Sequence, residues 1–172
     1  MNKNATTKSL LLVLMIFPLI GLAQTVKEFN EENTKVLRTS WEPLIKGLTA
    51  NMIVHVQCSR TNSDLELGFK LLWVKEGAVD EGAELQFTLD NDSIVTLNNS
   101  RFTLPCVGCG AVRFFGSGDL GFYLRFAIPP PEANKLATQK IKKVRLYMTD
   151  GYIENNVKAK SGDLIQKELR LL

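Results

Sequence analysis

Apolar and polar residues alternate in many short runs, and this period of two is the feature that most constrains the fold. In residues 52–58, for example, Met52, Val54, Val56 and Cys58 alternate with polar side chains. Successive side chains of a strand point to opposite faces, so such a run predicts a strand with one buried face. Similar runs occur at 65–73, 85–89, 95–97, 102–104, 122–128 and 144–148. The chain is therefore expected to consist mainly of short strands.

The segments between several of these runs carry residues that favour hairpin turns. Thr, Asn, Asp or Ser residues fill 61–64 and 90–93, and Asp-Gly occupies 150–151. Asn and Asp side chains accept local hydrogen bonds in turns, and Asp-Gly suits a two-residue hairpin connection. Each of these segments is therefore expected to join two antiparallel strands.

Two short helices are expected beside the strands. The three prolines at 129–131 end a strand and suit the first turn of a short helix. Ser161 is expected to cap a C-terminal amphipathic helix that carries Ile165 and Leu169 on its apolar face. The predicted fold is mainly β, an antiparallel sandwich or rolled sheet with these two helices, which makes it a β-rich α+β fold.

Residues 25–50 mix charged and apolar side chains without a clear period. Within them we expect Trp41 to tuck against the hydrophobic core. Large aromatic side chains such as Trp41 and Trp73 lie in cores more often than they form binding platforms.

Residues 1–23 have the order of a secretory signal peptide, with two lysines, an apolar run at 10–20 and small residues up to Ala23. Cleavage is expected after Ala23. The apolar run has eleven residues; as a helix it would span about 16 Å, whereas the hydrocarbon core of a bilayer is roughly 30 Å thick. We therefore expect a single β-rich domain over 24–172, exported to the periplasm or the exterior, with no transmembrane segment.

The charges of the mature chain nearly balance, because removal of the two leader lysines leaves 19 basic and 18 acidic residues. Nucleic-acid binding depends on concentrated positive charge, so no nucleic-acid partner is expected. No cofactor is expected either. Residues 116–121 spell GxGxxG, but they lead into a predicted strand, whereas a dinucleotide site needs the start of a helix.

Cys106 and Cys109 form a CxxC pair inside the glycine-rich segment 105–121. In redox proteins such a pair opens a helix, whose N-terminus lowers the pKa of the first thiol. Here the following residues are glycine, β-branched and aromatic, which predicts a tight bend closed by a structural disulfide. A thiol–disulfide or redox-sensing role for Cys106 and Cys109 is the alternative.

Together with His55 and Cys58, this pair would supply the ligand types of a structural zinc site. Residues three apart on a strand face opposite sides, so His55 and Cys58 are not expected to reach one ion. We therefore expect Cys58 in the core, His55 in solvent and no metal site. The single histidine and the scattered carboxylates also give no catalytic set.

Five segments are the basis of a resemblance to other proteins: RTSWE at 38–42, LQFTLDNDSIVTL at 85–97, CVGCG at 106–110, FGSGDLG at 115–121 and KKVRLYMTDGYIENNV at 142–157. In this combination the chain resembles a group of uncharacterised exported proteins of Gram-negative bacteria. The resemblance implies export and a β-rich domain, and it implies no particular activity.

The sequence therefore favours an exported, non-enzymatic β-rich domain that serves as a binding or structural module of the cell envelope. A sheet face or the 105–121 loop is expected to contact its envelope or extracellular partner. No catalytic, cofactor-binding or metal-binding residue is expected.

Overall fold

The computed structural model describes residues 25–31, 34–46, 52–72 and 77–172. The strands are β1 (Val26–Glu31), β2 (Thr34–Thr39), β3 (Glu42–Ile45), β4 (Ile53–Thr61), β5 (Asp64–Leu72), β6 (Glu84–Leu89), β7 (Ile94–Asn98), β8 (Cys106–Val107), β9 (Leu120–Ile128), β10 (Ile141–Met148) and β11 (Gly151–Asn156). The helices are α1 (Pro130–Thr138), a 3-10 turn (Ala159–Ser161) and α2 (Leu164–Leu171). The leader predicted at 1–23 and Trp73 lie outside the described residues.

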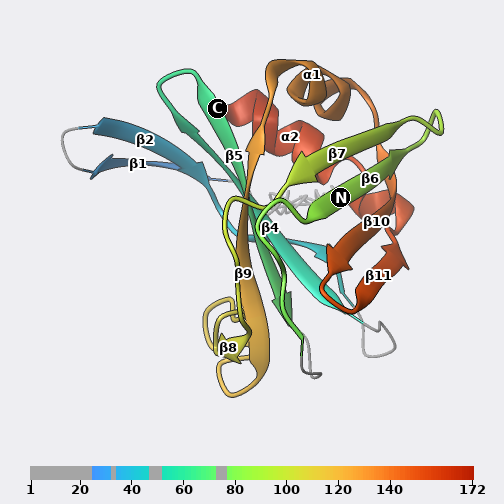
Figure 1. The fold of residues 1–172 in the computed structure, drawn as a ribbon. Helices are drawn as coiled ribbons and strands as arrows, with labels where there is room; N and C mark the ends of the chain where they lie inside the picture. Colours follow the sequence, from blue (N-terminus) through green and yellow to red (C-terminus); the bar gives the residue numbers. More distant parts are fainter. Residues whose placement is uncertain (1–24, 32–33, 47–51, 73–76) are drawn as a thin grey trace, which may run out of the picture.

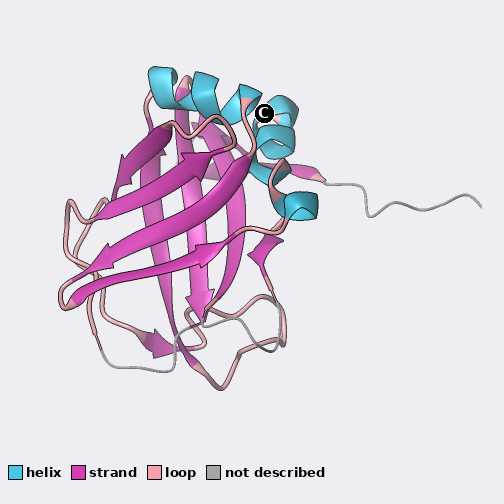
Figure 2. Ribbon diagram, turned by 90° about the vertical axis from the view of Figure 1, so that its right-hand side faces the viewer, coloured by secondary structure: helices cyan, strands magenta, loops and turns pink. Residues whose placement is uncertain are grey.

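Within the described residues, the strands form two antiparallel sheets, which confirms the predicted fold class (Figures 1 and 2). The larger sheet has the order β1-β2-β4-β5-β9-β8, and β3 also pairs with β4. The smaller sheet has the order β11-β10-β6-β7. Figure 2 shows the helices together at one end of the molecule. The fold therefore has two layers with a helical cover at one end.

The three predicted hairpins are present. The β4–β5 pair runs without interruption from Ile53 opposite Leu72 to Thr61 opposite Asp64. The β6–β7 and β10–β11 pairs close in the same way around the turns at 90–93 and 149–150. Asn62, Asp92 and Gly151 adopt positive φ angles in or beside these turns, a conformation that Asn, Asp and Gly tolerate best.

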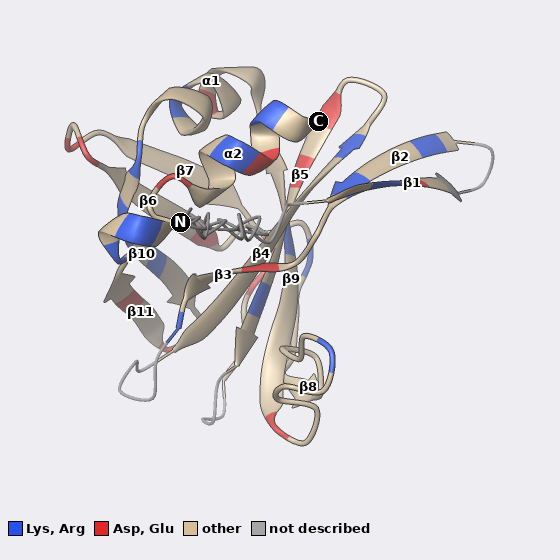
Figure 3. Cartoon of the chain, turned by 180° about the vertical axis from the view of Figure 1, so that it is seen from behind, with Lys and Arg blue, Asp and Glu red and all other residues tan. Residues whose placement is uncertain are grey.

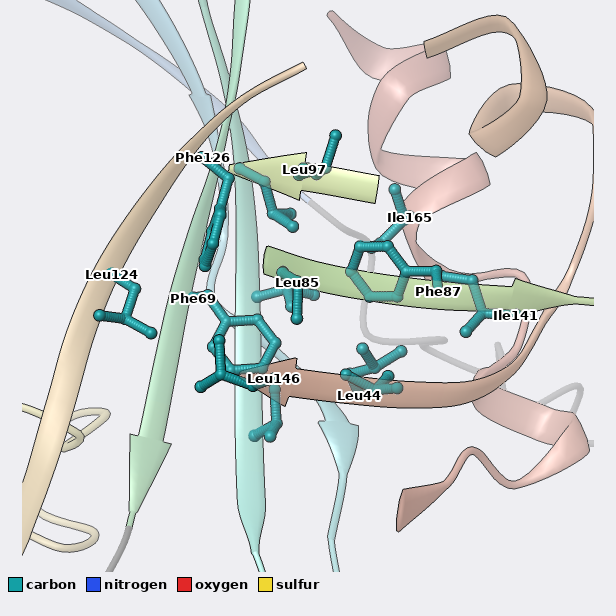
Figure 4. Close-up of a cluster of buried hydrophobic side chains, with 14 of the residues drawn as sticks. Leu44, Phe69, Leu85, Phe87, Leu97, Leu124, Phe126, Ile141, Leu146 and Ile165 are labelled. Carbon is teal, nitrogen blue, oxygen red and sulfur yellow. The ribbon is translucent and has the colours of Figure 1, made fainter. Parts of the chain in front are cut away.

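The core lies between the two sheets and under α2 (Figure 4). Phe69 of β5 and Phe126 of β9 pack edge to face, with their ring centroids 6.1 Å apart. Leu85 and Phe87 of the smaller sheet and Ile165 of α2 are fully buried as well. Burying one such side chain contributes about 1.5–3 kcal/mol. The strand residues among them are the ones that the alternation predicted, and Cys58 lies in the same core. Ile165 was predicted from the apolar face of the C-terminal helix.

The strand predicted at 102–104 is wrong. Thr103 alone forms a bridge, with Val79, while Phe102 and Leu104 are exposed. This segment crosses from β7 of the smaller sheet to β8 of the larger sheet. It therefore has no continuous partner strand, and its alternation does not correspond to a buried face.

The predicted core position of Trp41 is also wrong. Leu44 of β3 enters the core, whereas Trp41 lies on the outer face of the larger sheet, above Gly68. The missing side chain at Gly68 leaves the space that the indole fills.

The cap of the C-terminal helix differs from the prediction as well. Asp163 precedes α2, and Ser161 ends the 3-10 turn before it. The chain therefore makes one tighter turn before α2 begins.

Candidate functional site

The 105–121 loop forms a bend that contains β8 and leads into β9, as predicted for a bend before a strand. The sulfurs of Cys106 and Cys109 form a disulfide, and their Cα atoms are 5.3 Å apart. The Gly108 N–H donates to the Asp119 carbonyl (2.9 Å), and Val112 and Phe115 exchange backbone hydrogen bonds (3.1 and 3.2 Å). No helix occurs within this loop, so the pair lacks the helix N-terminus that lowers thiol pKa values in redox proteins.

Two glycines allow this loop to pack closely against the sheet. A Cβ at Gly110 would lie 2.5 Å from the Leu71 carbonyl oxygen, and Gly116 combines a φ of +75° with close contact to the Leu72 side chain. Only a residue without a side chain fits either position. The GxGxxG pattern therefore reflects packing in a bend, and its last glycine, Gly121, already belongs to β9.

His55 and Cys58 lie on opposite faces of β4, as the sequence predicted. Cys58 is fully buried, whereas the His55 ring is half-buried on the outer face, 6.2 Å from the Phe115 ring. In the described part of the chain, no three His, Cys, Asp or Glu side chains gather in a way that could hold a metal ion. The four residues of the zinc hypothesis are therefore not brought together.

The outer face of the larger sheet carries a row of side chains of which the sequence analysis singled out only His55. The pairings of β4, β5 and β9 place His55, Lys70 and Tyr123 in one row across the three strands. The neighbouring row contains Gln57 and Gly68. Because every second residue of a strand faces this side, the row is a direct consequence of the register.

Trp41 packs against two residues of this row, Lys70 and Tyr123. Its ring packs edge to face against Tyr123, with the centroids 5.6 Å apart. The Lys70 Nζ lies 4.7 Å from the centroid of Trp41 and 5.7 Å from that of Tyr123. It also donates a hydrogen bond to the Ala111 carbonyl of the loop (2.7 Å). The ammonium group is therefore held by two aromatic faces and one carbonyl oxygen.

A hollow of about 280 Å³ opens beside this cluster, and we call it the Trp41 hollow. Its lining comes from the β1–β2 hairpin, the β2–β3 connection, the sheet face and the loop: Thr25, Lys27, Phe29, Thr39, Ser40, Trp41, Gln57, Lys70, Val112 and Arg113. Three of these described residues are cationic, and none is acidic. Figure 3 shows basic residues on the β1–β2 hairpin and on the loop that carries β8. The fold therefore brings together cations that are far apart in the sequence.

Burial lowers the pKa of Lys70. The lowered pKa means that the ammonium form is less well solvated here than in water. An anion placed in the Trp41 hollow would offset part of this loss of solvation, since opposite charges attract more strongly where water is partly excluded. The local chemistry therefore favours an anionic ligand.

Glu168 of α2 is a second residue that sequence analysis missed. It is fully buried beside Cys58 and Thr39, and within the described residues neither carboxyl oxygen has a hydrogen-bond partner of good geometry. Burial raises its pKa to about 8. The neutral acid is therefore the stable form in the folded protein at neutral pH, and it contributes to packing rather than to an accessible site.

The sequence contained one signal for the position of Trp41 and one for the burial of Glu168. Glycine inside a strand pattern, here Gly68, often indicates close approach of another group. Glu168 stands three residues after Ile165, within the apolar stripe of the C-terminal helix. Neither signal identifies the contacting residue.

Searches against protein-family models, curated proteins and solved structures found no match. None of the helices in the described part of the chain has the length and apolar character needed to cross a membrane.

Proposed function

We propose that this chain is an exported, non-enzymatic binding module that takes a small anionic ligand into the Trp41 hollow. Export is inferred from the leader at 1–23, and the envelope or the exterior is the proposed place of action. The observation that carries the proposal is Lys70, whose ammonium group lies between Trp41 and Tyr123 at the edge of the hollow.

The charge of the hollow supports an anion. Lys27 approaches from β1 and Arg113 from the loop, so cations surround the space on different sides. Arg and Lys bind carboxylate, sulfate or phosphate groups through charge-assisted hydrogen bonds. The proposed ligand therefore carries at least one such group.

The size and walls of the hollow define the rest of the ligand. Its volume of about 280 Å³ lies near the lower end of the roughly 300–1,000 Å³ that small-molecule sites occupy. Trp41 and Phe29 supply aromatic surface, and Gln57 supplies a polar group. A small molecule with one acidic group and a flat or apolar body fits these walls better than a bare ion.

Isothermal titration calorimetry of the purified mature chain with phosphate, sulfate, benzoate and glucuronate tests this proposal by measuring the heat of binding. We expect saturable binding of at least one organic acid, which Lys70→Met removes while keeping the aliphatic stem of the side chain. Lys158→Met changes an exposed lysine that does not line the hollow and should leave binding intact. Absence of binding by all four probes, or equal losses in both variants, would overturn the proposal.

A thiol–disulfide role for Cys106 and Cys109 is the second candidate, and the exposure of Cys106 favours it, because an exchange partner has to reach the sulfur. In that role an external thiolate would attack one sulfur, form a mixed disulfide and release the other as a thiolate. Catalysis of insulin reduction by dithiothreitol would support this candidate. A rate equal to that of Cys106→Ser/Cys109→Ser would exclude it.

A further inference from the structure

The 102–120 segment exposes an unusual amount of apolar surface. Of the ten large apolar side chains that are exposed in the described residues, six belong to this segment: Phe102, Leu104, Val107, Phe114, Phe115 and Leu120. Phe114 is 95% exposed and Val107 is 68% exposed. Single exposed apolar residues are ordinary, but six of them within one segment single this segment out as the place to look for an interaction surface.

Phe114, the most exposed residue of the group, lies in a turn that is closed by hydrogen bonds. Arg113 has a φ of +57°, which is uncommon for a residue with a side chain. Reciprocal hydrogen bonds between Val112 and Phe115 close this turn, and the Phe115 ring lies against His55. Phe114 therefore projects from a fixed position at the turn that we call the loop tip, residues 113–115.

Positive charge lies in the loop tip and in the hollow next to it. Arg113 precedes Phe114 and lines the Trp41 hollow together with Lys27 and Lys70. Asp119 is the one acid within 102–121 and lies five residues beyond Phe114 in the chain. An exposed aromatic side chain next to cations complements the boundary between acyl chains and anionic headgroups.

We propose that the loop tip docks this module on an anionic membrane surface. Phe114 enters the boundary between headgroups and acyl chains, and Arg113 contacts headgroup phosphates. A fluid bilayer accepts a convex, protruding side chain without a matching pocket, which a protein partner would have to supply. This inference goes beyond ligand binding in the Trp41 hollow and does not depend on it.

Vesicle co-sedimentation tests the proposal with the purified mature chain. We expect binding to mixed phosphatidylcholine–phosphatidylglycerol vesicles, weaker binding to phosphatidylcholine alone, and loss of binding as salt is raised. Phe114→Ser should lower the partition constant by at least about tenfold, because the buried aromatic surface is lost. Ile94→Ser removes an exposed apolar residue outside the loop, Ile94 of β7, which is 52% exposed, and should have no effect.

The outcomes separate this proposal from the ligand proposal. Phe114 does not line the Trp41 hollow, so Phe114→Ser should keep organic-acid binding and a native circular dichroism spectrum while it loses vesicle binding. The membrane proposal is overturned if the wild-type chain stays in the supernatant, if neutral vesicles bind equally well, or if Phe114→Ser and Ile94→Ser behave alike. Failure of the organic acids to bind leaves the vesicle result unaffected.

Discussion

Trp41 and Gly68 fit each other closely on the outer face of the larger sheet. A Cβ built on Gly68 would lie 2.9 Å from the Cη2 atom of Trp41, which is shorter than an ordinary carbon–carbon contact. The indole therefore occupies the space that a side chain of β5 would otherwise take. This fit positions Trp41 beside Lys70 and Tyr123, and the Trp41 hollow depends on it.

Gly68→Ala should displace Trp41 and destabilise the protein by about 1–3 kcal/mol, the range of overpacking changes. Urea unfolding followed by circular dichroism gives the free energy, and tryptophan fluorescence reports the displaced ring. Gly118→Ala is the matched control, because no atom of the described residues lies within 4 Å of the added Cβ. Equal effects of the two variants would contradict the fit described above.

Glu168 should make the stability of the protein fall as pH rises. Its pKa is about 8 in the folded protein and near 4.5 in the unfolded chain. Between these values the folded state holds a proton that the unfolded state has released. The free energy of unfolding therefore falls by up to about 1.4 kcal/mol per pH unit in this window, and the contribution is constant above pH 8.

The test compares urea unfolding of the wild-type chain and Glu168→Gln from pH 5 to 9. Gln cannot ionise, so the variant should gain stability relative to the wild type as pH rises. Cys58, Thr39 and Glu42 are the neighbouring groups that influence this carboxyl group and remain unchanged. Glu84→Gln, at an exposed position of β6, should follow the wild-type profile. Parallel profiles for all three proteins would contradict the neutral, buried state of Glu168.

The strands and hairpins could be predicted because their signals are local. Alternation over 52–58 and the Asp-Gly pair at 150–151 each determine the structure of their own segments. The Trp41 hollow could not be predicted, since it depends on the register of β4, β5 and β9. A shift of one residue would turn Lys70 toward the core.

The two wrong predictions about apolar residues have a related cause. Trp41 belongs to a segment without a clear period, where its residue type suggested burial, and Phe102 belongs to an alternating run of only three residues. Their positions depend on which segments cover them, and this is a tertiary property. The burial of Glu168 has the same origin, because α2 docks with that side of the helix against β4.

His55 should make the stability fall on acidification. Burial is the main cause that lowers its pKa below 6.5; Lys70 and Lys46 lower it further, and Glu42 opposes them. As pH falls through 6.5, the unfolded chain takes up a proton before the folded protein does. Stability is therefore lost from pH 6.5 down to the folded pKa.

Unfolding of Glu168→Gln and of Glu168→Gln/His55→Gln from pH 4 to 7 isolates this effect, since Glu168 contributes the opposite slope there. The double variant should lose less stability on acidification. An unchanged slope would mean that His55 is as well solvated in the fold as in the unfolded chain.

Removal of the disulfide should affect the loop far more than the sheets. Cys106 and Cys109 are three residues apart, and closing so short a segment contributes about 2 kcal/mol at most by the chain-entropy model. The loop is also held by Gly110 against Leu71 and by the Lys70 hydrogen bond to Ala111. Cys106→Ser/Cys109→Ser should therefore fold with the same sheets.

Amide hydrogen exchange distinguishes a local from a global role. In the double serine variant, the amides of Val112 and Phe115 should exchange faster, while the amides of the β4–β5 pair keep their protection. Cys58→Ala leaves the disulfide in place and should not accelerate exchange at Val112 or Phe115. Loss of protection throughout the larger sheet in the double serine variant would show instead that the disulfide supports the whole fold.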